Sequence, residues 1–503
     1  MFDIDFSRLA ALFAYDSASP MIFSSGLFLF LFLGFTVVYG LLAKRDTARI
    51  VFVTLFSYYF YYKSSGIYFL LLATVTLSDY YLAHLIDRQR HRARLYLWLS
   101  VIIDLGLLGY FKYTNFFGAL CFPDWQHLDI FLPVGVSFFT FQSLSYTIDV
   151  YRQRIKPLNS PLDYAFYVSF FPQLVAGPIV RARDFIPQIR KPLVITRQMV
   201  GTGLFFILSG LFKKAVISDY LSLNFVDRIF ENPAHYTGVE NLLGIYGYAI
   251  QIYCDFSGYS DMAIGIALTL GFTFPINFNN PYRSRSITEF WRRWHISLSS
   301  WLRDYLYISL GGNRKGKLRQ YLNLVITMLL GGLWHGASLN FVLWGGIHGV
   351  FLSLDKMWHS LCPRFSPLRY LPRKPSAPAI DNTTWKARLY GVVCGLVTFH
   401  IVAAAWVLFR ASSFETASSI ATQIFTNFCP GVFLQWFVSY KYAALLLILG
   451  FVLHFLPERC TVYVRDLISR SPMFLQALYV VVIVIIVVQI KTSEVQPFIY
   501  FQF

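Results

Sequence analysis

Charged residues are scarce in this chain: only 14% of its 503 residues are Asp, Glu, Lys or Arg, while 56% are hydrophobic and 19% aromatic. The mean hydropathy of +0.52 sets it apart from soluble domains. Acids are scarcer than bases, 26 against 43, which gives a formal net charge of +17. In so apolar a chain this excess is typical of cytoplasmic loops and not of nucleic-acid binding. The composition predicts a polytopic protein surrounded by membrane lipid, with no nucleic-acid partner.

The chain also lacks any close pairing of cysteines. Its six cysteines are scattered and none forms a C-x-x-C pair, so neither a metal site nor a disulfide framework is indicated. No internal repeat and no separate soluble region interrupts the apolar pattern, which predicts a single transmembrane domain over 1–503, with its core of motifs at about 131–355. The run 21–43 is longer than a signal-peptide core and is expected to be a retained first span.

Apolar runs long enough to cross a membrane recur along the chain. A helix needs about 20 residues to cross a hydrocarbon core of about 30 Å. Runs that approach this length lie at 21–43, 66–87, 95–111, 131–150, 198–218, 241–273, 389–409, 438–457 and 473–490. Shorter runs at 50–62, 321–334 and 340–354 are predicted to be tilted or hairpin-forming helices. The pattern therefore predicts about 11–12 spans.

The basic residues cluster between these runs. The clusters lie at 44–45, 88–94, 152–156, 283–319, 364–388 and 459–470. With twelve spans they all fall on one side, which is the cytoplasmic side because Lys and Arg resist translocation. Both termini are then expected outside.

One apolar stretch, 166–183, does not fit a simple span because Pro172, Gly177 and Pro178 interrupt it. Irregular backbone at membrane depth is tolerated only where protein or water satisfies it. The stretch is interpreted either as a re-entrant segment that lines an internal vestibule or as a surface hairpin.

A second region of interest surrounds His295. On a helical wheel a polar stripe faces away from aromatic residues, and the stripe consists of Arg292, His295, Ser299 and Arg303. This pattern predicts an amphipathic helix. Two interpretations stay open: the helix lies on the inner leaflet among lipid head groups, or His295 contacts the reactants.

His335 lies in the turn Trp334–Ser338 between the two short runs 321–334 and 340–354. Because those runs rise less than the hydrocarbon core is thick, the turn is predicted to lie within the membrane at the floor of a cavity. The alternative is a histidine that only hydrogen-bonds a neighbouring helix. His348, among glycines, is interpreted as helix packing.

Polar residues also occur inside two of the long apolar runs. Asp255 and Asp261 are six residues apart, too far around a regular helix to form a carboxylate dyad. Each is expected to pair with a base or to orient a histidine. Tyr259 lies between them, and Gln142 adds polarity to the run 131–150.

Several longer motifs share one resemblance. They lie at 132–152 (LPVGVSFFTFQSLSYTIDVYR), 170–182, 253–265, 277–314 (with NPY and EFWRRWHISLS), 331–349 (with GGLWHGAS), 406–411 and the terminal PFIYFQF. Together they resemble the membrane-bound O-acyltransferase family, most closely its bacterial alginate O-acetylation branch. The resemblance covers nearly the whole chain.

The resemblance implies an all-α polytopic fold in which tilted, re-entrant and interfacial helices surround a central funnel or tunnel. It implies that His335 is the catalytic histidine and His295 the second motif histidine. Residues expected to bind substrate or line the tunnel are Trp334, Asn280, Arg292, Ser299, Asp255, Tyr259 and Gln142. The predicted location is the bacterial inner membrane.

The implied reaction moves an acyl group, most simply acetyl, from a cytoplasmic thioester to a hydroxyl of an extracytoplasmic polysaccharide or partner protein. The thioester, acetyl-CoA or an acyl-carrier protein, is a substrate, and neither a tightly bound cofactor nor a metal is expected. An acetyltransferase- or esterase-like partner outside the membrane is implied as well. The alternatives are D-alanyl transfer to teichoic acid, a transporter or flippase of a cell-surface precursor, and a non-catalytic scaffold. A transporter would show repeat symmetry, which the sequence lacks.

Overall fold

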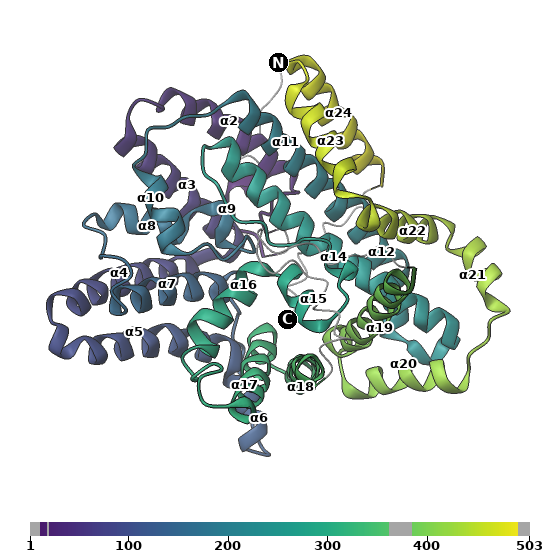
Figure 1. Ribbon diagram of the computed structural model, residues 1–503. Coiled ribbons are helices and arrows are strands. Elements are labelled where there is room, and N and C mark those ends of the chain that lie inside the picture. Colours follow the sequence, from purple (N-terminus) through teal and green to yellow (C-terminus); the bar gives the residue numbers. More distant parts are fainter. Residues whose placement is uncertain (1–10, 18–19, 362–384, 491–503) are drawn as a thin grey trace.

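The computed structural model of the chain describes residues 11–17, 20–361 and 385–490, and every regular element within these ranges is a helix. The all-α fold class is therefore confirmed. Figure 1 places α15 (Ile287–Arg293) and α16 (Ile296–Trp301) near the middle of the view, with longer helices around them. The basic residues at 364–384 and the terminal PFIYFQF motif lie outside the described residues.

The surrounding helices fall into two groups along the chain. The N-terminal group contains α2 (Gly26–Leu41), α3 (Asp46–Ser65), α4 (Phe69–Arg88), α5 (Ala93–Leu108), the π-helical turn η3 (Gly109–Tyr113), α6 (Thr114–Cys121), α7 (Val136–Tyr151), α8 (Pro161–Ser169), α9 (Phe171–Leu174) and α10 (Ala182–Ile189). The later group contains α11 (Arg197–Leu211), η4 (Phe212–Ser218), α14 (Gly238–Thr269), α17 (Lys317–His335), α18 (Leu339–Leu361), α19 (Trp385–Arg410), α20 (Phe414–Thr426), α21 (Val432–Ser439), α22 (Lys441–Phe455), α23 (Glu458–Arg470) and α24 (Met473–Ile490).

Fewer helices pass a strict test for membrane spans than the 11–12 expected. By length and apolar composition alone, five helical segments of the described chain could cross a membrane, or six if the bent pair α21 and α22 is one span. Some expected spans correspond to helices that are shorter than 18 residues, such as α2 and α7 with 16 residues each, and others to helices that carry polar residues on buried faces, such as α14 with Asp255. These polar residues face protein and not lipid, so composition alone underestimates how many helices belong to the bundle.

The helices on either side of His335 are longer than predicted. α17 has 19 residues and α18 has 23, whereas the sequence predicts runs too short to span comfortably. At 1.5 Å per residue α17 rises about 28 Å, close to the thickness of a hydrocarbon core. The helix begins at Lys317, four residues before its apolar run, and Asn323 in its first turns donates to the carbonyl of Gly312 at 2.9 Å. His335 is therefore at the far end of α17 from the basic cluster 283–319.

The acids of α14 pair with bases. Asp255 accepts a salt bridge from Lys214 at 2.6 Å, and Asp261 accepts one from Lys213, also at 2.6 Å. Both lysines belong to η4, which packs against α14. The prediction that each acid pairs with a base is confirmed, and α14 continues unbroken through Gly258, so the acids do not form a dyad.

The interrupted stretch 166–183 is buried inside the protein. Residues 166–182 are all buried, and the chain between α9 and α10 is irregular. Side chains satisfy its backbone: Ser57 Oγ accepts from the amide of Phe171 at 3.1 Å, and Ser297 Oγ accepts from the amide of Ile179 at 3.0 Å. These contacts support a re-entrant segment and exclude a surface hairpin.

Hydrogen bonds join several basic clusters on one face of the protein. Arg90 donates to the carbonyl of Tyr151 at 3.2 Å, and Arg152 donates to Ser309 Oγ at 2.9 Å. We call the surface formed by residues 88–94, 151–156 and 302–319 the basic face. These three clusters therefore lie together in space. The number of spans predicted between them also puts them on the same side of the membrane.

The re-entrant segment returns to this same face. Arg181, just beyond the irregular stretch, forms a salt bridge with Asp304 at 2.5 Å, and Arg303 contacts the same carboxylate at 2.6 Å. Burial alone would raise the pKa of Asp304, but the hydrogen bonds from Arg303 and Arg181 lower that pKa below its usual range.

Close packing of α17 on α18 generates a stability prediction. A Cβ at Gly345 would lie 2.1 Å from the carbonyl oxygen of Met328, whereas a Cβ at the neighbouring Gly346 meets only the end of the Leu329 side chain at 3.2 Å. Gly345→Ala should therefore separate the helices and cost about 1–3 kcal/mol, seen as a lower midpoint of thermal unfolding in detergent. Gly346→Ala is the matched control, and equal melting of the two variants would contradict this packing.

Candidate active site

His295 does not lie on a continuous amphipathic helix, and the helical-wheel prediction is wrong. α15 ends at Arg293, and His295 adopts the left-handed conformation (φ 42°, ψ 56°) immediately before α16. Its side chain is 0% exposed, so it is not on the solvent-facing stripe with Arg292. The wheel failed because the backbone reverses direction at this point, which rotates His295 away from the residues before it.

Asn277 stabilises this break between α15 and α16. Its Oδ1 accepts hydrogen bonds from the backbone amide of Ser297 at 3.1 Å and from Ser297 Oγ at 2.9 Å, and its backbone carbonyl accepts from Ile296 at 2.9 Å. Its Nδ2 donates to Ser260 Oγ of α14 at 3.2 Å. One buried amide therefore joins the junction to the longest helix of the fold.

The same amide fixes the tautomer of His295. Asn277 Oδ1 lies 3.2 Å from His295 Nδ1. Because Oδ1 already accepts from a backbone amide, the atom is an oxygen and can only accept, so Nδ1 carries the hydrogen. Nε2 then holds the ring's lone pair, and it has no hydrogen-bond partner among the described residues. His295 is therefore able to accept a proton at Nε2.

His335 is the last residue of α17 and is buried among aromatic rings. Its ring centroid lies 4.9 Å from that of Trp334, 5.1 Å from Trp344 and 5.3 Å from Phe409. Only 3% of the residue is exposed. The predicted open cavity does not reach His335, which is enclosed by these three rings instead.

Trp334 connects the two histidines to a cavity. Its ring stacks on Phe141 at 5.2 Å, and Phe141 stacks in turn on Trp301 at 3.9 Å with the planes 2° apart. The Trp334 ring also lies 6.3 Å from that of His295. A single indole thus contacts both imidazoles that the sequence predicts to be catalytic.

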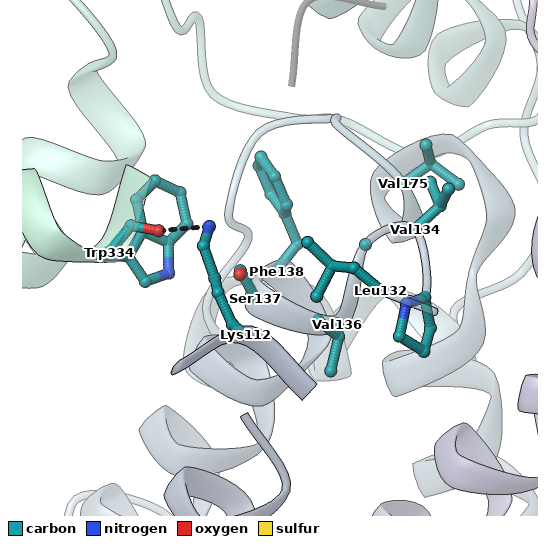
Figure 2. Close-up of a pocket in the computed structure, with 10 residues that line it drawn as sticks. Lys112, Leu132, Val134, Val136, Ser137, Phe138, Val175 and Trp334 are labelled. Atoms are coloured by element: carbon teal, nitrogen blue, oxygen red, sulfur yellow. Dashed lines mark hydrogen bonds between the residues drawn. The ribbon is translucent and has the colours of Figure 1, made fainter. Parts of the chain in front are cut away.

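The cavity has a volume of about 70 Å³ and is lined by Trp334, Lys112, Val175 and residues 132–138 (Figure 2). Val175 belongs to the re-entrant segment, so that segment does line an internal space next to the Trp334–Ser338 turn. Neither His295 nor His335 is among the lining residues. A reactant in this cavity therefore meets Trp334 before either histidine.

Three further predicted residues are buried beside the site without lining the cavity. Asp255 pairs with Lys214, and the ring of Tyr259 stacks on Phe23 with centroids 4.6 Å apart. Gln142 is 0% exposed, and its backbone carbonyl accepts from Ser145 Oγ at 2.7 Å. Their surroundings in the structure are those of packed helix interfaces.

The remaining predicted residues belong to the segment around His295, and the backbone amide of Ser299 donates to the carbonyl of His295 at 2.9 Å. Arg292 is exposed, and Ser299 Oγ donates to the carbonyl of Trp294 at 3.2 Å within its own junction. Asn280 adopts a left-handed conformation (φ 44°, ψ 63°) before a short 3₁₀ turn. These three are not brought together with His335.

Sequence reasoning missed Lys112, Asn277 and His348. Lys112 is a lone base at the end of an apolar run, and Asn277 stands in the motif before Pro281, so each carried a detectable signal. The glycine neighbours of His348, Gly345 and Gly349, pack on α17, whereas His348 itself accepts from Trp291 Nε1 of α15 at 3.3 Å and is 0% exposed. Within the described residues, no group of three or more His, Cys, Asp or Glu is arranged to hold a metal ion.

The model of the membrane-bound O-acyltransferase family matches residues 58–383. The protein named "Probable alginate O-acetylase" of Pseudomonas aeruginosa is 40% identical over 79% of this chain and 73% of its own length. "Peptidoglycan O-acetyltransferase" of Helicobacter pylori is 36% identical over 82% and 81%. "Teichoic acid D-alanyltransferase" of Bacillus subtilis is 27% identical over 78% and 98%.

The role of Asn277 at the junction can be tested by stability. Asn277→Ala removes an acceptor shared by buried donors, and leaving such donors unsatisfied costs about 1–3 kcal/mol. The exposed Asn279, whose contacts in this loop are made by its backbone amide and carbonyl, supplies the matched control Asn279→Ala. We expect a lower midpoint of thermal unfolding only for Asn277→Ala; an unchanged midpoint would contradict the assigned hydrogen bonds.

Proposed function

The chain belongs to the membrane-bound O-acyltransferase family, and from this premise we propose that it carries an acyl group across the bacterial inner membrane. The resemblance predicted from its motifs is confirmed, and the protein is a multi-pass membrane acyltransferase that acts on hydroxyl groups. The proposed donor is a cytoplasmic thioester, acetyl-CoA or an acyl-carrier protein. The proposed acceptor is a hydroxyl of an extracytoplasmic polysaccharide or other cell-envelope polymer.

His335 is the proposed general base. The acceptor oxygen attacks the thioester carbonyl carbon while the imidazole takes the hydroxyl proton; the C–O bond forms, the C–S bond breaks, and the thiolate leaves with a proton returned by the imidazolium. The observation that carries this assignment is the position of Trp334, whose indole lines the cavity and contacts both motif imidazoles. A thioester has a good leaving group, so this chemistry needs no metal.

His295 is proposed to assist this proton transfer. Asn277 holds its Nδ1–H, which leaves the Nε2 lone pair directed into the protein interior. Because the ring lies against Trp334 as well, His295 is placed to accept a proton beside His335 or to orient the reactants. Packing between Phe256 and His295, with centroids 4.6 Å apart, restricts its ring.

The basic face is the proposed entry side for the donor. Arg303, 63% exposed, carries positive charge there, which attracts the phosphates of a CoA or phosphopantetheine group. The far end of α17, where His335 lies, is then nearer the acceptor. By analogy with the relatives' acceptors we also propose an acetyltransferase- or esterase-like partner outside the membrane that delivers the acyl group to the polymer.

The two histidines should differ in mutational effect. His335→Ala should lower acyl transfer by about 10²- to 10⁴-fold, the typical contribution of a general base, while protein level and thermal stability stay close to wild type. His295→Ala should retain more activity. The assay uses inverted membrane vesicles that contain the host's envelope polymers, with radiolabelled acetyl-CoA outside and base-labile label counted in the polymer. His91→Ala, at an exposed histidine of the basic face, is the control, and wild-type turnover in His335→Ala would remove the proposed mechanism.

The orientation predicts a labelling pattern. His91 is exposed on the basic face, and His127 is exposed in the loop between α6 and α7. On a cysteine-free background, a membrane-impermeant maleimide added to intact cells should label His127→Cys and leave His91→Cys unlabelled until the membrane is opened. The reverse pattern would show that the basic face is extracytoplasmic and that the proposed direction of transfer is wrong.

A further inference from the structure

Two consecutive side chains of η3 donate hydrogen bonds to the end of the helix that carries His335. Lys112 Nζ donates to the backbone carbonyls of Trp334 at 2.7 Å and His335 at 2.8 Å. Tyr113 Oη donates to the carbonyl of Leu333 at 2.9 Å. Three successive carbonyls of the last turn of α17 are therefore bound by residues more than 200 positions earlier in the chain. In Figure 2 the Lys112 side chain extends toward Trp334, and a dashed line marks its hydrogen bond to the Trp334 carbonyl.

These carbonyls need donors from outside the helix. The last four carbonyls of an α-helix have no partner within it. Helices often solve this by folding back through a left-handed residue, but at Gly336 the chain leaves α17 in extended conformation (φ −159°, ψ 151°). Lys112 supplies donors at that point, and its positive charge also suits the negative end of the helix dipole.

The position of His335 makes this contact relevant to catalysis. His335 is the last helical residue, so the direction of its ring depends on the backbone of the terminal turn. A terminal turn frays easily unless its carbonyls are held. Lys112 bonds the carbonyl of His335 itself, and it comes from a π-helical turn, a local geometry that frequently occurs at functional sites.

We infer that Lys112 is a positioning residue of the acyltransferase, which together with Tyr113 fixes the Trp334–His335 turn so that the imidazole is held in its reactive orientation. The inference rests on the proposed function, since it assumes that His335 acts on the reactants. Lys112 acts through the backbone and not by binding the acyl donor. Its loss should therefore change turnover more than donor affinity.

The test replaces Lys112 by residues that remove or keep the donors. Lys112→Met keeps an unbranched apolar chain and removes both hydrogen bonds; Lys112→Arg keeps the charge and the N–H groups. In inverted vesicles supplied with radiolabelled acetyl-CoA, Lys112→Met should lower kcat by about 10- to 100-fold, the scale expected for a small misplacement of a catalytic group, with KM for acetyl-CoA changed less than about two-fold. Lys112→Arg should recover most of kcat.

Two neighbouring residues complete the design. Tyr113→Phe removes one of the three hydrogen bonds and should lower kcat by a smaller factor. If Lys112→Met fails to accumulate in the membrane, Tyr113→Phe tests the inference in its place. Thr114→Val is the matched control, because the Thr114 hydroxyl donates to the carbonyl of Tyr110 within its own segment at 2.7 Å and not to α17. Its kcat should equal that of wild type.

Specific outcomes would overturn the inference. A raised KM with unchanged kcat would make Lys112 a substrate-binding residue, and a Lys112→Arg variant as inactive as Lys112→Met would exclude a role through donated hydrogen bonds. Wild-type kcat in both Lys112→Met and Tyr113→Phe would exclude positioning altogether. His335→Ala separates this inference from the proposed role of His335: if His335→Ala is inactive while Lys112→Met is fully active, only the inference fails, whereas a fully active His335→Ala removes the proposed role of His335 as the general base.

Discussion

Every backbone amide and carbonyl inside an apolar protein needs a hydrogen-bond partner, and the structure around the two histidines depends on this requirement. The chain departs from regular helix at three buried places here: the re-entrant segment, the junction before α16 and the end of α17. At each place a polar side chain from elsewhere in the sequence supplies the hydrogen-bond partner that the helix no longer provides. Ser297, Asn277 and Lys112 are the residues that do so.

Ser297 and Asn277 are bonded to each other, so the re-entrant segment and the junction before α16 are structurally dependent. The amide of Ile179 donates to Ser297 Oγ, and Ser297 Oγ donates to Asn277 Oδ1. Asn277 continues the chain of hydrogen bonds to Ser260 on α14. Because a buried amide without a partner costs about 1–3 kcal/mol, displacing any one of these segments weakens the support of the others. His295 is bonded to the middle of this network, which explains how a left-handed non-glycine residue is held in place.

The sequence predicted the helical class from composition. It also offered a re-entrant segment, against a surface hairpin, and acids paired with bases, against acids that orient a histidine, and the structure selects the first of each pair. It did not predict the break at His295, since a wheel assumes a continuous helix and Asn277, which stabilises the break, lies 18 residues away. The length of α17 was underestimated because the mostly polar residues 317–320 continue the helix before its apolar run. The enclosure of His335 depends on Phe409 and Trp344, which belong to two other helices. A local sequence pattern does not predict such a contact between helices. The single-domain boundary and the roles assigned to the site residues stay predictions.

Both histidines lie at helix ends, and this placement follows from the same constraint. In the middle of a buried helix the backbone is already satisfied, so a histidine there needs a separate side-chain partner, as His348 has in Trp291. At a helix end the backbone already requires donors and acceptors, and polar side chains must gather there in any case. Asn277, which satisfies the junction before α16, also fixes the tautomer of His295, and Lys112, which satisfies the end of α17, also holds the residue that carries the His335 ring. The groups that complete the backbone at these two helix ends are therefore also the groups that hold the two histidines.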